Sequence, residues 1–511
     1  MIKGHATIDA TADYADRQAP VSYVPLGRTE LKASPAGFGG YRISTGVSQH
    51  EKALRAAICS GINLIDTSTN YADGGSETLV GQVIEDLTTS GDVERQQVII
   101  ISKVGYLQGE NFTLSQQRKS EGRPFQDLVE YDQGLEHCIH PEFIEDQLTR
   151  SLARLKLETL DGYLLHNPEY YLGWAKKSGV TLESARREYY RRIRAAFDHL
   201  EKEIEKGRIR FYGISSNTFP SNSDDPEFTC LETVWEIAES VSADHHFGLV
   251  QMPFNLLEPG AAVEVNQPGG NSALSFAEGK NLGVLINRPL NAFAGNRLLR
   301  LADLAQTVRM DTNEVIEKIR QLIKSETRLW RKILPHLDIP PGLKVRVKQQ
   351  NEVGDSLKHY WKNFGSYENF RQARKGMFWP RVQGVFNFLA PYAKENAELA
   401  QWMTSHSACL EEAFDAVGSI YVEDAARLLN RIRYAVNGAD PEWEKPGTLS
   451  QKAVRVLRST TGVSVVLVGM RREAYVEDVL IEIRQSLEQK DRRGSWARLR
   501  QGTEALFPSS G

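Results

Sequence analysis

The strongest constraint on the fold is an alternation of two kinds of segment that continues to about residue 290. Short runs of β-branched and apolar residues alternate with longer stretches, such as 50–60 and 189–206, whose apolar residues recur at helical spacing. This order is typical of strand–helix–strand units around a parallel sheet. The runs that predict strands are 63–66, 98–102, 159–165, 210–214, 249–252, 283–287 and 463–468.

Reactive side chains lie at the ends of three of these predicted strands. Asp66 ends the first run, and Tyr71 lies one short loop later; Lys103 follows the second run and His166 the third. Taken singly, such residues have plainer explanations, because an aspartate after a strand is often a helix cap and a lysine is often a solvated charge. Together they match a (β/α)8 barrel, which places reactive residues at the C-terminal ends of its strands. We therefore predict an α/β fold, a TIM barrel that is an enzyme.

These four residues, in this order, resemble the catalytic tetrad of the aldo-keto reductases. The resemblance covers residues from about 22 to 293 and from about 448 to 485. It implies an NAD(P)H-dependent oxidoreductase that interconverts an aldehyde or ketone, sugars included, and its alcohol. The other matching segments are Val24 to Ser34, Gly37 to Tyr41, Asn63 to Thr67, Ser76-Glu77, Ser151 to Leu155, Gly213 to Ser215, Gln251, Pro289-Leu290 and Gly469 to Arg472.

The resemblance implies a role for each member of the tetrad. Tyr71 would be the general acid/base, which works best when its pKa is near the working pH. Because free tyrosine titrates near 10, the ammonium of Lys103 is expected to lower the pKa of Tyr71, with Asp66 anchoring the lysine. His166 would orient the substrate carbonyl or join the proton relay.

Two segments are candidate walls of the substrate pocket. The loop over 106–138 departs from the compact family pattern and is rich in polar and aromatic residues, and Trp174 follows His166. Loops at the mouth of a barrel set substrate choice. Both segments could equally pack as a cover without touching a ligand, and the sequence leaves these two interpretations open.

No Gly-x-Gly-x-x-Gly motif lies between a predicted strand and a helix, so a Rossmann domain is not indicated. The resemblance implies instead an extended nicotinamide dinucleotide across the barrel mouth. Ser215, Asn217 and Gln251 would hold the carboxamide, with the asparagine shifted by one position from the family pattern, and Phe254 would stack on the nicotinamide. The other residues implied to approach the cofactor are Gly39, Gly40, Tyr41, Pro289, Leu290 and Gly469.

An arginine pair bears on which dinucleotide is bound. Arg471 and Arg472 follow the last predicted strand and precede a helix, a place where backbone amides and the helix dipole favour phosphate. Arg471, with Arg472 as second choice, is expected to pair with a 2'-phosphate, which predicts NADP with NADPH preferred over NADH. A solvated arginine pair is the alternative.

The last predicted strand is separated from its predecessor by about 175 residues, far more than an ordinary connection. Within this gap, Asp311 and Glu314 resemble a capping box ahead of an apolar helical face, and 421–436 is a second predicted helix. We therefore predict three parts in the chain. They are a flexible N-terminal arm over 1–21, a barrel over 22–302 and 448–511, and a mainly helical insertion over 303–447.

The insertion contains a basic and aromatic stretch. Between Lys344 and Arg381 there are nine basic and three acidic residues, with aromatic residues among them. Such a stretch can bind nucleic acid, but it is more often a helical core with a solvated basic face. The alternatives to an enzyme are therefore a cofactor-sensing or scaffold barrel of low turnover whose insertion binds a protein partner, and an RNA-binding module. The insertion begins after Pro289-Leu290, which also fits a cover over the dinucleotide.

The composition of the chain bears on nucleic-acid binding, metal binding and membrane insertion. A net charge of -4 disfavours a general nucleic-acid-binding surface. The four cysteines lack paired spacing, so no metal site is predicted. No run approaches about 18 consecutive apolar residues, and the N-terminus lacks the apolar core of a secretory signal. We expect a cytoplasmic protein without a membrane segment that acts on a small-molecule carbonyl or alcohol.

Overall fold

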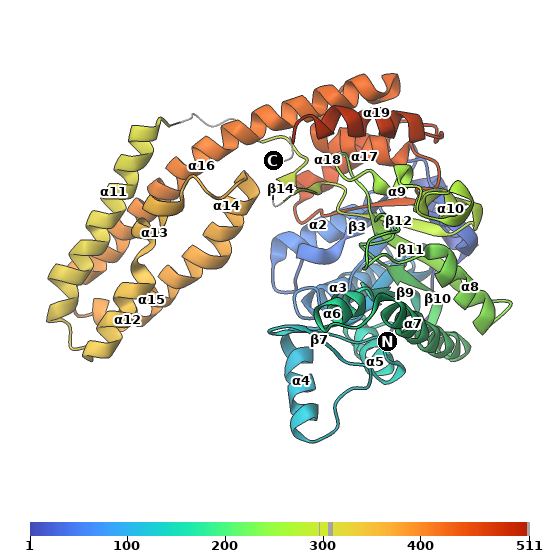
Figure 1. Ribbon diagram of the computed structural model, residues 1–511, viewed down its shortest axis with the longest axis horizontal. Coiled ribbons are helices and arrows are strands. Elements are labelled where there is room, and N and C mark those ends of the chain that lie inside the picture. Colours follow the sequence, from blue (N-terminus) through green and yellow to red (C-terminus); the bar gives the residue numbers. More distant parts are fainter. Residues whose placement is uncertain (296, 305–309, 508–511) are drawn as a thin grey trace. The chain divides into compact units, whose positions relative to one another are not determined.

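The computed structural model describes residues 1–295, 297–304 and 310–507, and its course is drawn in Figure 1. By its internal contacts the chain divides into two compact units. We call the first the barrel unit, which comprises Met1–Leu290 and Val436–Glu504. The second, the helical unit, comprises Asn291–Ala435 and Ala505–Gly511.

The barrel unit is built on a closed barrel of eight parallel strands, which confirms the predicted fold. Seven of these strands overlap the predicted runs. The unpredicted strand is β3, whose sequence Ala-Gly-Phe-Gly has no β-branched residue. Around the barrel the order is β3 (Ala36–Gly39), β4 (Leu64–Asp66), β5 (Ile99–Val104), β9 (Leu160–His166), β10 (Ile209–Ser215), β11 (Phe247–Pro253), β12 (Gly283–Asn287) and β15 (Val465–Val468), which pairs again with β3.

Helices surround this barrel (Figure 1), as expected where the faces of a parallel sheet must be covered. On α7, for example, the buried residues Tyr189, Ile193 and Phe197 recur every four positions and form the face turned to the core. The helices are α2 (Ser48–Cys59), α3 (Gly75–Ser90), α4 (Gly109–Ser120), α5 (Pro141–Leu155), α6 (Tyr170–Lys177), α7 (Leu182–Glu205), α8 (Leu231–Val241), α9 (Gly260–Val263), α10 (Ala273–Gly279), α17 (Leu449–Arg458), α18 (Glu473–Ile483) and α19 (Arg493–Glu504).

The barrel interior is a packed hydrophobic core and not a channel. Leu64, Ile101, Leu164 and Leu249 all belong to one buried cluster. The same cluster includes Leu26, beside the short hairpin of β1 (Val24–Pro25) and β2 (Lys32–Ala33). Packing inside the barrel leaves the strand ends and the loops to carry the site.

The prediction of a flexible N-terminal arm is wrong. Residues Ile8–Arg17 form helix α1, which begins at the capping side chain of Thr7. Tyr14 is buried, and its hydroxyl donates to the carbonyl oxygen of Ile58. The polar composition concealed this helix because only a narrow stripe, Thr11 and Tyr14, is buried.

The helical unit begins with a hairpin of β13 (Asn291–Ala294) and β14 (Arg297–Arg300). The capping box at Asp311 and Glu314 is present at the start of α11. The helix predicted over 421–436 is the C-terminal part of the much longer α16. The helices are α11 (Thr312–Arg328), α12 (Pro341–Asn351), α13 (Val353–Tyr360), α14 (Tyr367–Ala373), α15 (Trp379–Ala393) and α16 (Ala397–Ala439), with π-helical turns at Leu329–Ile333 and Arg374–Phe378.

Both predicted boundaries of the insertion are displaced. The hairpin belongs to the helical unit because Ser366 and Asn369 of that unit hydrogen-bond the backbone of Leu298. At the other end, Trp443 is fully buried in the barrel unit, where its indole nitrogen donates to Ser459 Oγ. Side-chain packing therefore determines both observed boundaries.

Candidate active site

The structure brings the four residues of the predicted tetrad together at the ends of β4, β5 and β9. Lys103 Nζ donates to Asp66 Oδ2 at 2.7 Å and to the Tyr71 hydroxyl at 3.2 Å. The rings of Tyr71 and His166 meet edge to face, with centroids 5.9 Å apart. All four residues are buried. A phenol, an ammonium, a carboxylate and an imidazole therefore share one desolvated site.

Burial sets the protonation states in this site. It lowers the pKa of Lys103, while the Asp66 carboxylate opposes that shift. It also lowers the pKa of His166 well below 6.5, with the charge of Lys103 acting in the same direction, so the imidazole is neutral. A neutral imidazole keeps one N–H donor and one acceptor nitrogen.

The expected lowering of the Tyr71 pKa is not found. Burial, followed by the Asp66 carboxylate and the neighbouring Tyr41, raises the pKa of Tyr71 well above 10. The ammonium of Lys103 does lie within hydrogen-bond distance, but its charge is compensated by Asp66 at 2.7 Å. The phenol is therefore protonated at neutral pH, as a proton donor must be.

Two of the residues predicted to hold a carboxamide are joined to the tetrad. Gln251 Nε2 donates to Asp66 Oδ1 at 2.8 Å, and Ser215 Oγ donates to Gln251 Oε1 at 3.1 Å. Both side chains are buried. Asn217 is different, because it is exposed and only its backbone N–H is held, by Glu169 Oε1 at 2.8 Å.

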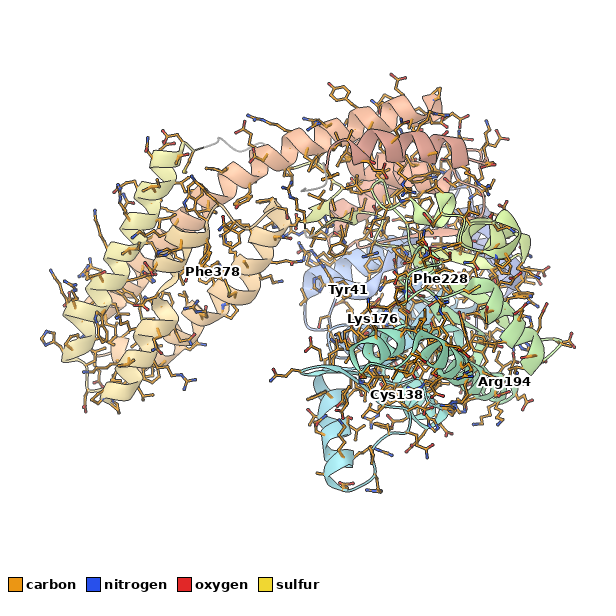
Figure 2. The ribbon with its side chains drawn as sticks, in the orientation of Figure 1. Tyr41, Cys138, Lys176, Arg194, Phe228 and Phe378 are labelled. Atoms are coloured by element: carbon orange, nitrogen blue, oxygen red, sulfur yellow. The ribbon has the colours of Figure 1, made fainter. Side chains whose placement is uncertain are left out.

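The predicted glycine turn also lies against the tetrad. A Cβ atom on Gly40 would be 2.7 Å from the carbonyl oxygen of Asp66, and one on Gly39 would be 3.3 Å from the backbone of Val468. Tyr41, labelled in Figure 2, is 64% exposed and places its ring 5.2 Å from that of Tyr71. This turn therefore forms one wall of the site, and at Gly40 the close approach to Asp66 leaves no room for a side chain.

The structure contradicts the stacking role given to Phe254. Its ring is completely buried and packs on Trp496, with centroids 4.2 Å apart. A ring enclosed in this way has no face free for a nicotinamide. The sequence could not show this, because Trp496 lies about 240 residues further along the chain and is brought in by α19.

The remaining predicted cofactor residues surround the ends of β12 and β15. Pro289 and Leu290 are buried after β12. Gly469 is exposed after β15, and Arg472 is the N-cap residue of α18. Among the described residues, neither Arg471 nor Arg472 forms an ion pair, and both retain some solvent exposure.

Several further residues lie near the tetrad. Ser68 and Glu169 were missed by the sequence analysis, whereas Tyr106 and His137 lie in the segment 106–138 that was predicted as a candidate pocket wall. Ser68 Oγ lies 3.1 Å from His166 Nδ1, and the ring of Tyr106 lies 4.8 Å from that of His166. His137 Nε2 donates to the backbone carbonyl of His166 at 2.7 Å. Glu169 is buried, which raises its pKa to about 7. The position of Ser68, two residues after Asp66, is a signal that would have found this serine.

These contacts also locate the two candidate walls of the pocket. The segment over 106–138 folds into β6 (Tyr106–Leu107), α4, β7 (Val129–Asp132) and β8 (Leu135–His137), and Tyr106 and His137 hold it beside His166. Trp174 is half-buried, and its ring contact is with Tyr171 at 5.8 Å. Only the first segment therefore borders the tetrad through an identified contact.

The sequence was found to be similar to one protein family and to several characterised proteins. Residues 36–258 match the aldo/keto reductase family. An NADH-specific methylglyoxal reductase of Escherichia coli (strain K12) is 29% identical over 201 residues, which are 36% of this chain and 56% of that protein. A 6-dehydroglucose reductase of Novosphingobium aromaticivorans is 24% identical over 213 residues, or 40% of this chain and 54% of that protein.

A third relative is named as a channel subunit and not as a reductase. It is a putative voltage-gated potassium channel subunit beta of Schizosaccharomyces pombe, 28% identical over 167 residues, or 31% of this chain and 40% of that protein. The chain thus spans about half the length of the curated relatives that it matches. Residues 36–258, which contain the tetrad at the ends of the barrel strands, are thus similar to the aldo/keto reductase family.

Proposed function

We propose that this protein is an NAD(P)H-dependent oxidoreductase that interconverts an aldehyde or ketone and its alcohol. The observation that carries the proposal is the hydrogen-bonded chain from Asp66 through Lys103 to the Tyr71 hydroxyl, with His166 beside it. The relatives named as reductases support the same reaction class.

The proton chemistry follows from this chain of contacts. Tyr71, whose raised pKa keeps it protonated, donates its proton to the carbonyl oxygen of the substrate. Lys103, at 3.2 Å, then stabilises the phenolate that forms, and Asp66 keeps the ammonium charged and in place. His166 would orient the carbonyl oxygen between these groups.

The residues present fit a nicotinamide dinucleotide. After β15, a Cβ atom on Gly469 would meet no atom of the described residues within 4 Å, so open space borders this glycine. The Oδ1 atom of Asn287, at the end of β12, is buried without a hydrogen-bond partner in the described part of the chain. Gln251 and Ser215 supply amide and hydroxyl groups beside the tetrad. When bound, the cofactor would supply a hydride to the carbonyl carbon.

NADPH is proposed as the preferred cofactor because of Arg471 and Arg472. The E. coli relative is named as NADH-specific, so preference does not follow from similarity to the family. Arg471 and Arg472, which form no ion pair with any described residue, lie at the start of an 11-residue helix, a favourable place for a 2'-phosphate. We expect Arg471→Ala to weaken NADPH binding about tenfold and to leave NADH binding unchanged. Arg484→Ala, at the opposite end of α18, is the matched control, and equal losses for both dinucleotides would remove the assignment.

The test of the function has two stages on the purified chain. A fluorescence titration with NADPH and with NADH comes first, followed by an assay of NADPH oxidation with methylglyoxal and with sugar aldehydes. Saturable binding with turnover supports the reductase. Absence of binding by either dinucleotide contradicts it.

A cofactor-sensing or scaffold barrel remains the second candidate. The resemblance to a protein named as a potassium channel subunit is the observation that favours it. It predicts saturable NADPH binding with negligible oxidation across the carbonyl panel. A partner would then be sought for the helical unit.

The RNA-binding alternative has little structural support. In the basic stretch, Phe370 and Phe378 are almost completely buried in the core of the helical unit, and Trp361 is buried as well. Figure 2 shows Phe378 among these helices. Rings enclosed in a core have no face free for bases, although Tyr360 is exposed.

A further inference from the structure

The helical unit contains a cavity that the proposed reductase reaction does not use. Its volume is about 180 Å3, and it lies between α11, the π-helical turn over Leu329–Ile333, α12 and the start of α13. An apolar cavity of about 150 Å3 holds a molecule as large as benzene. This cavity is thus large enough for a small organic molecule.

Asn351 is a polar side chain without a partner at the wall of this cavity. The residue is only 2% exposed, and neither its Nδ2 nor its Oδ1 atom finds a hydrogen-bond partner in the described part of the chain. Buried amides are almost always hydrogen-bonded, because an unmet donor or acceptor loses its hydration without replacement. An amide offers a donor and an acceptor at once.

The charges at the cavity are unbalanced. The carboxylates of Glu352 and Asp355 and the carboxyl group of Glu326 line it, against the single ammonium of Lys348. Lys348 is already engaged, 3.5 Å from Glu352 and over the ring of Trp330 at 4.9 Å. Glu326 Oε1 accepts the backbone N–H groups of Val353 and Gly354, at 2.9 and 2.8 Å, and has no cationic partner in the described part of the chain.

The charge and shape select the kind of ligand. An anion would add to an excess of negative charge. A metal ion needs gathered ligands, and in the described part of the chain no three His, Cys, Asp or Glu side chains are placed to hold one. Trp330, whose ring already carries the Lys348 ammonium at 4.9 Å, gives the cavity an aromatic wall, which favours an organic cation. A molecule that fills the cavity can place a cationic group near the acidic side chains and a polar group near the Asn351 amide.

We propose that this cavity binds a small organic ammonium compound that also carries a hydroxyl or carbonyl group. Its positive charge is balanced by Glu326, Glu352 and Asp355, and its oxygen accepts a hydrogen bond from Asn351 Nδ2. Burial, with Glu352 and Asp355 nearby, raises the pKa of Glu326 to about 8, so a bound cation displaces a proton from this carboxyl at neutral pH. Binding is therefore accompanied by proton release.

The test is isothermal titration calorimetry of the full chain at pH 7 with ethanolamine and with 1,4-diaminobutane. Ethylene glycol and glycolate, at the same ionic strength, serve as neutral and anionic probes of matched size. We expect saturable binding of ethanolamine to one site, with an enthalpy that differs between phosphate and Tris buffers because a proton is released. No saturable heat with either amine up to about 10 mM, or equal binding of ethylene glycol, overturns the proposal.

Two variants locate the binding. Asn351→Leu and Glu326→Gln are each expected to weaken ethanolamine binding at least about fivefold. Glu317→Gln is the matched control, because Glu317 lies on the same helix, α11, outside the cavity and pairs with Arg320. Should Asn351→Leu lose its helical circular dichroism, the half-exposed Glu352→Gln takes its place. Unchanged affinity in the cavity variants shows that the amine binds elsewhere and overturns the proposal.

Discussion

At the scale of single residues, the site depends on one buried ammonium group that donates to three oxygen atoms. Lys103 is completely buried and bonded to Asp66 and Tyr71, and the backbone carbonyl of Thr67 accepts a third bond at 2.9 Å. Removing one partner of such a buried pair typically costs about 3–5 kcal/mol, because the other charge remains unpaired. Tyr71, by contrast, is neutral and can be changed without leaving a charge behind.

Tyr71→Phe is therefore the cleanest test of the proton donor. We expect NADPH affinity to be retained and carbonyl reduction to fall about 10²- to 10⁴-fold, the usual contribution of a positioned general acid. Steady-state kinetics measure the rate of carbonyl reduction, and NADPH fluorescence measures the affinity for the cofactor. Tyr434→Phe is the control, since Tyr434 is exposed and lies in the helical unit. Turnover that survives Tyr71→Phe would remove the acid assignment.

At the scale of elements, close approach between strands positions the site. A Cβ atom on Gly213 of β10 would lie 1.9 Å from the carbonyl oxygen of Leu249 on β11. The register of these two strands shifts between Tyr212 and Gly213, just before Ser215 pairs with Gln251. The absence of a side chain at one position therefore lets two strands deliver Ser215 and Gln251 to the tetrad.

Gly213→Ala is expected to destabilise the barrel unit by about 1–3 kcal/mol, the usual cost of forcing atoms into a packed core. Chemical denaturation followed by circular dichroism measures the loss. Gly279→Ala is the matched control, because a Cβ on that helical glycine meets nothing within 4 Å. Equal stability of the two variants would show that the strands separate without cost.

The free energy of unfolding of the helical unit is expected to depend on pH through Glu326. The folded pKa of Glu326 is about 8, above its ordinary value of 4.5, because burial disfavours the carboxylate. Between these values the folded state holds a proton that the unfolded state releases, so stability falls as pH rises from about 4.5 to 8 and is fully present below 4.5. The group is only 8% exposed, so solvent screening is small.

Glu326→Gln should remove this slope. The amide oxygen of glutamine can still accept the bonds from Val353 and Gly354, but it has no charge to lose. We expect the variant to gain about 2–5 kcal/mol relative to the parent between pH 5 and pH 8, seen in denaturation curves at both values. Glu317→Gln, half-exposed on the same helix, should leave the slope intact. A parent protein whose stability is constant over this range would contradict the prediction.

At the scale of the whole molecule, each of the two compact units has hydrophobic core residues of its own. Leu64, Leu164 and Leu249 belong to the barrel core, whereas Phe378 and Phe414 belong to a core in the helical unit. In the part of the chain that the structure describes, no helix is long and apolar enough to cross a membrane.

Phe378→Ala tests this division. Truncating a buried phenylalanine typically costs about 3–5 kcal/mol, so the helical unit should melt earlier in calorimetry. NADPH binding to the barrel unit should persist at temperatures below that transition. Met377→Ala, at the exposed neighbouring position, is the control. Simultaneous loss of cofactor binding at low temperature would mean that the two units do not fold separately.

The sequence alone determined those features that depend on residues close together along the chain. Repeated strand and helix patterns predicted the barrel, and the side chains at strand ends, Asp66, Lys103 and His166, predicted the tetrad, because parallel strands bring their C-terminal ends to one face. The capping box at Asp311 was equally visible, since it joins residues three apart.

Only the tertiary structure decided the rest. The fate of Phe254 depended on Trp496 from α19, the protonation of Tyr71 on burial, and the borders of the helical unit on which side chains pack together. The cavity at Asn351 arises where α11, α12 and α13 meet. Burial and contact between distant segments are properties of the folded chain, because solvation and charge interactions depend on distance in space and not on spacing in sequence.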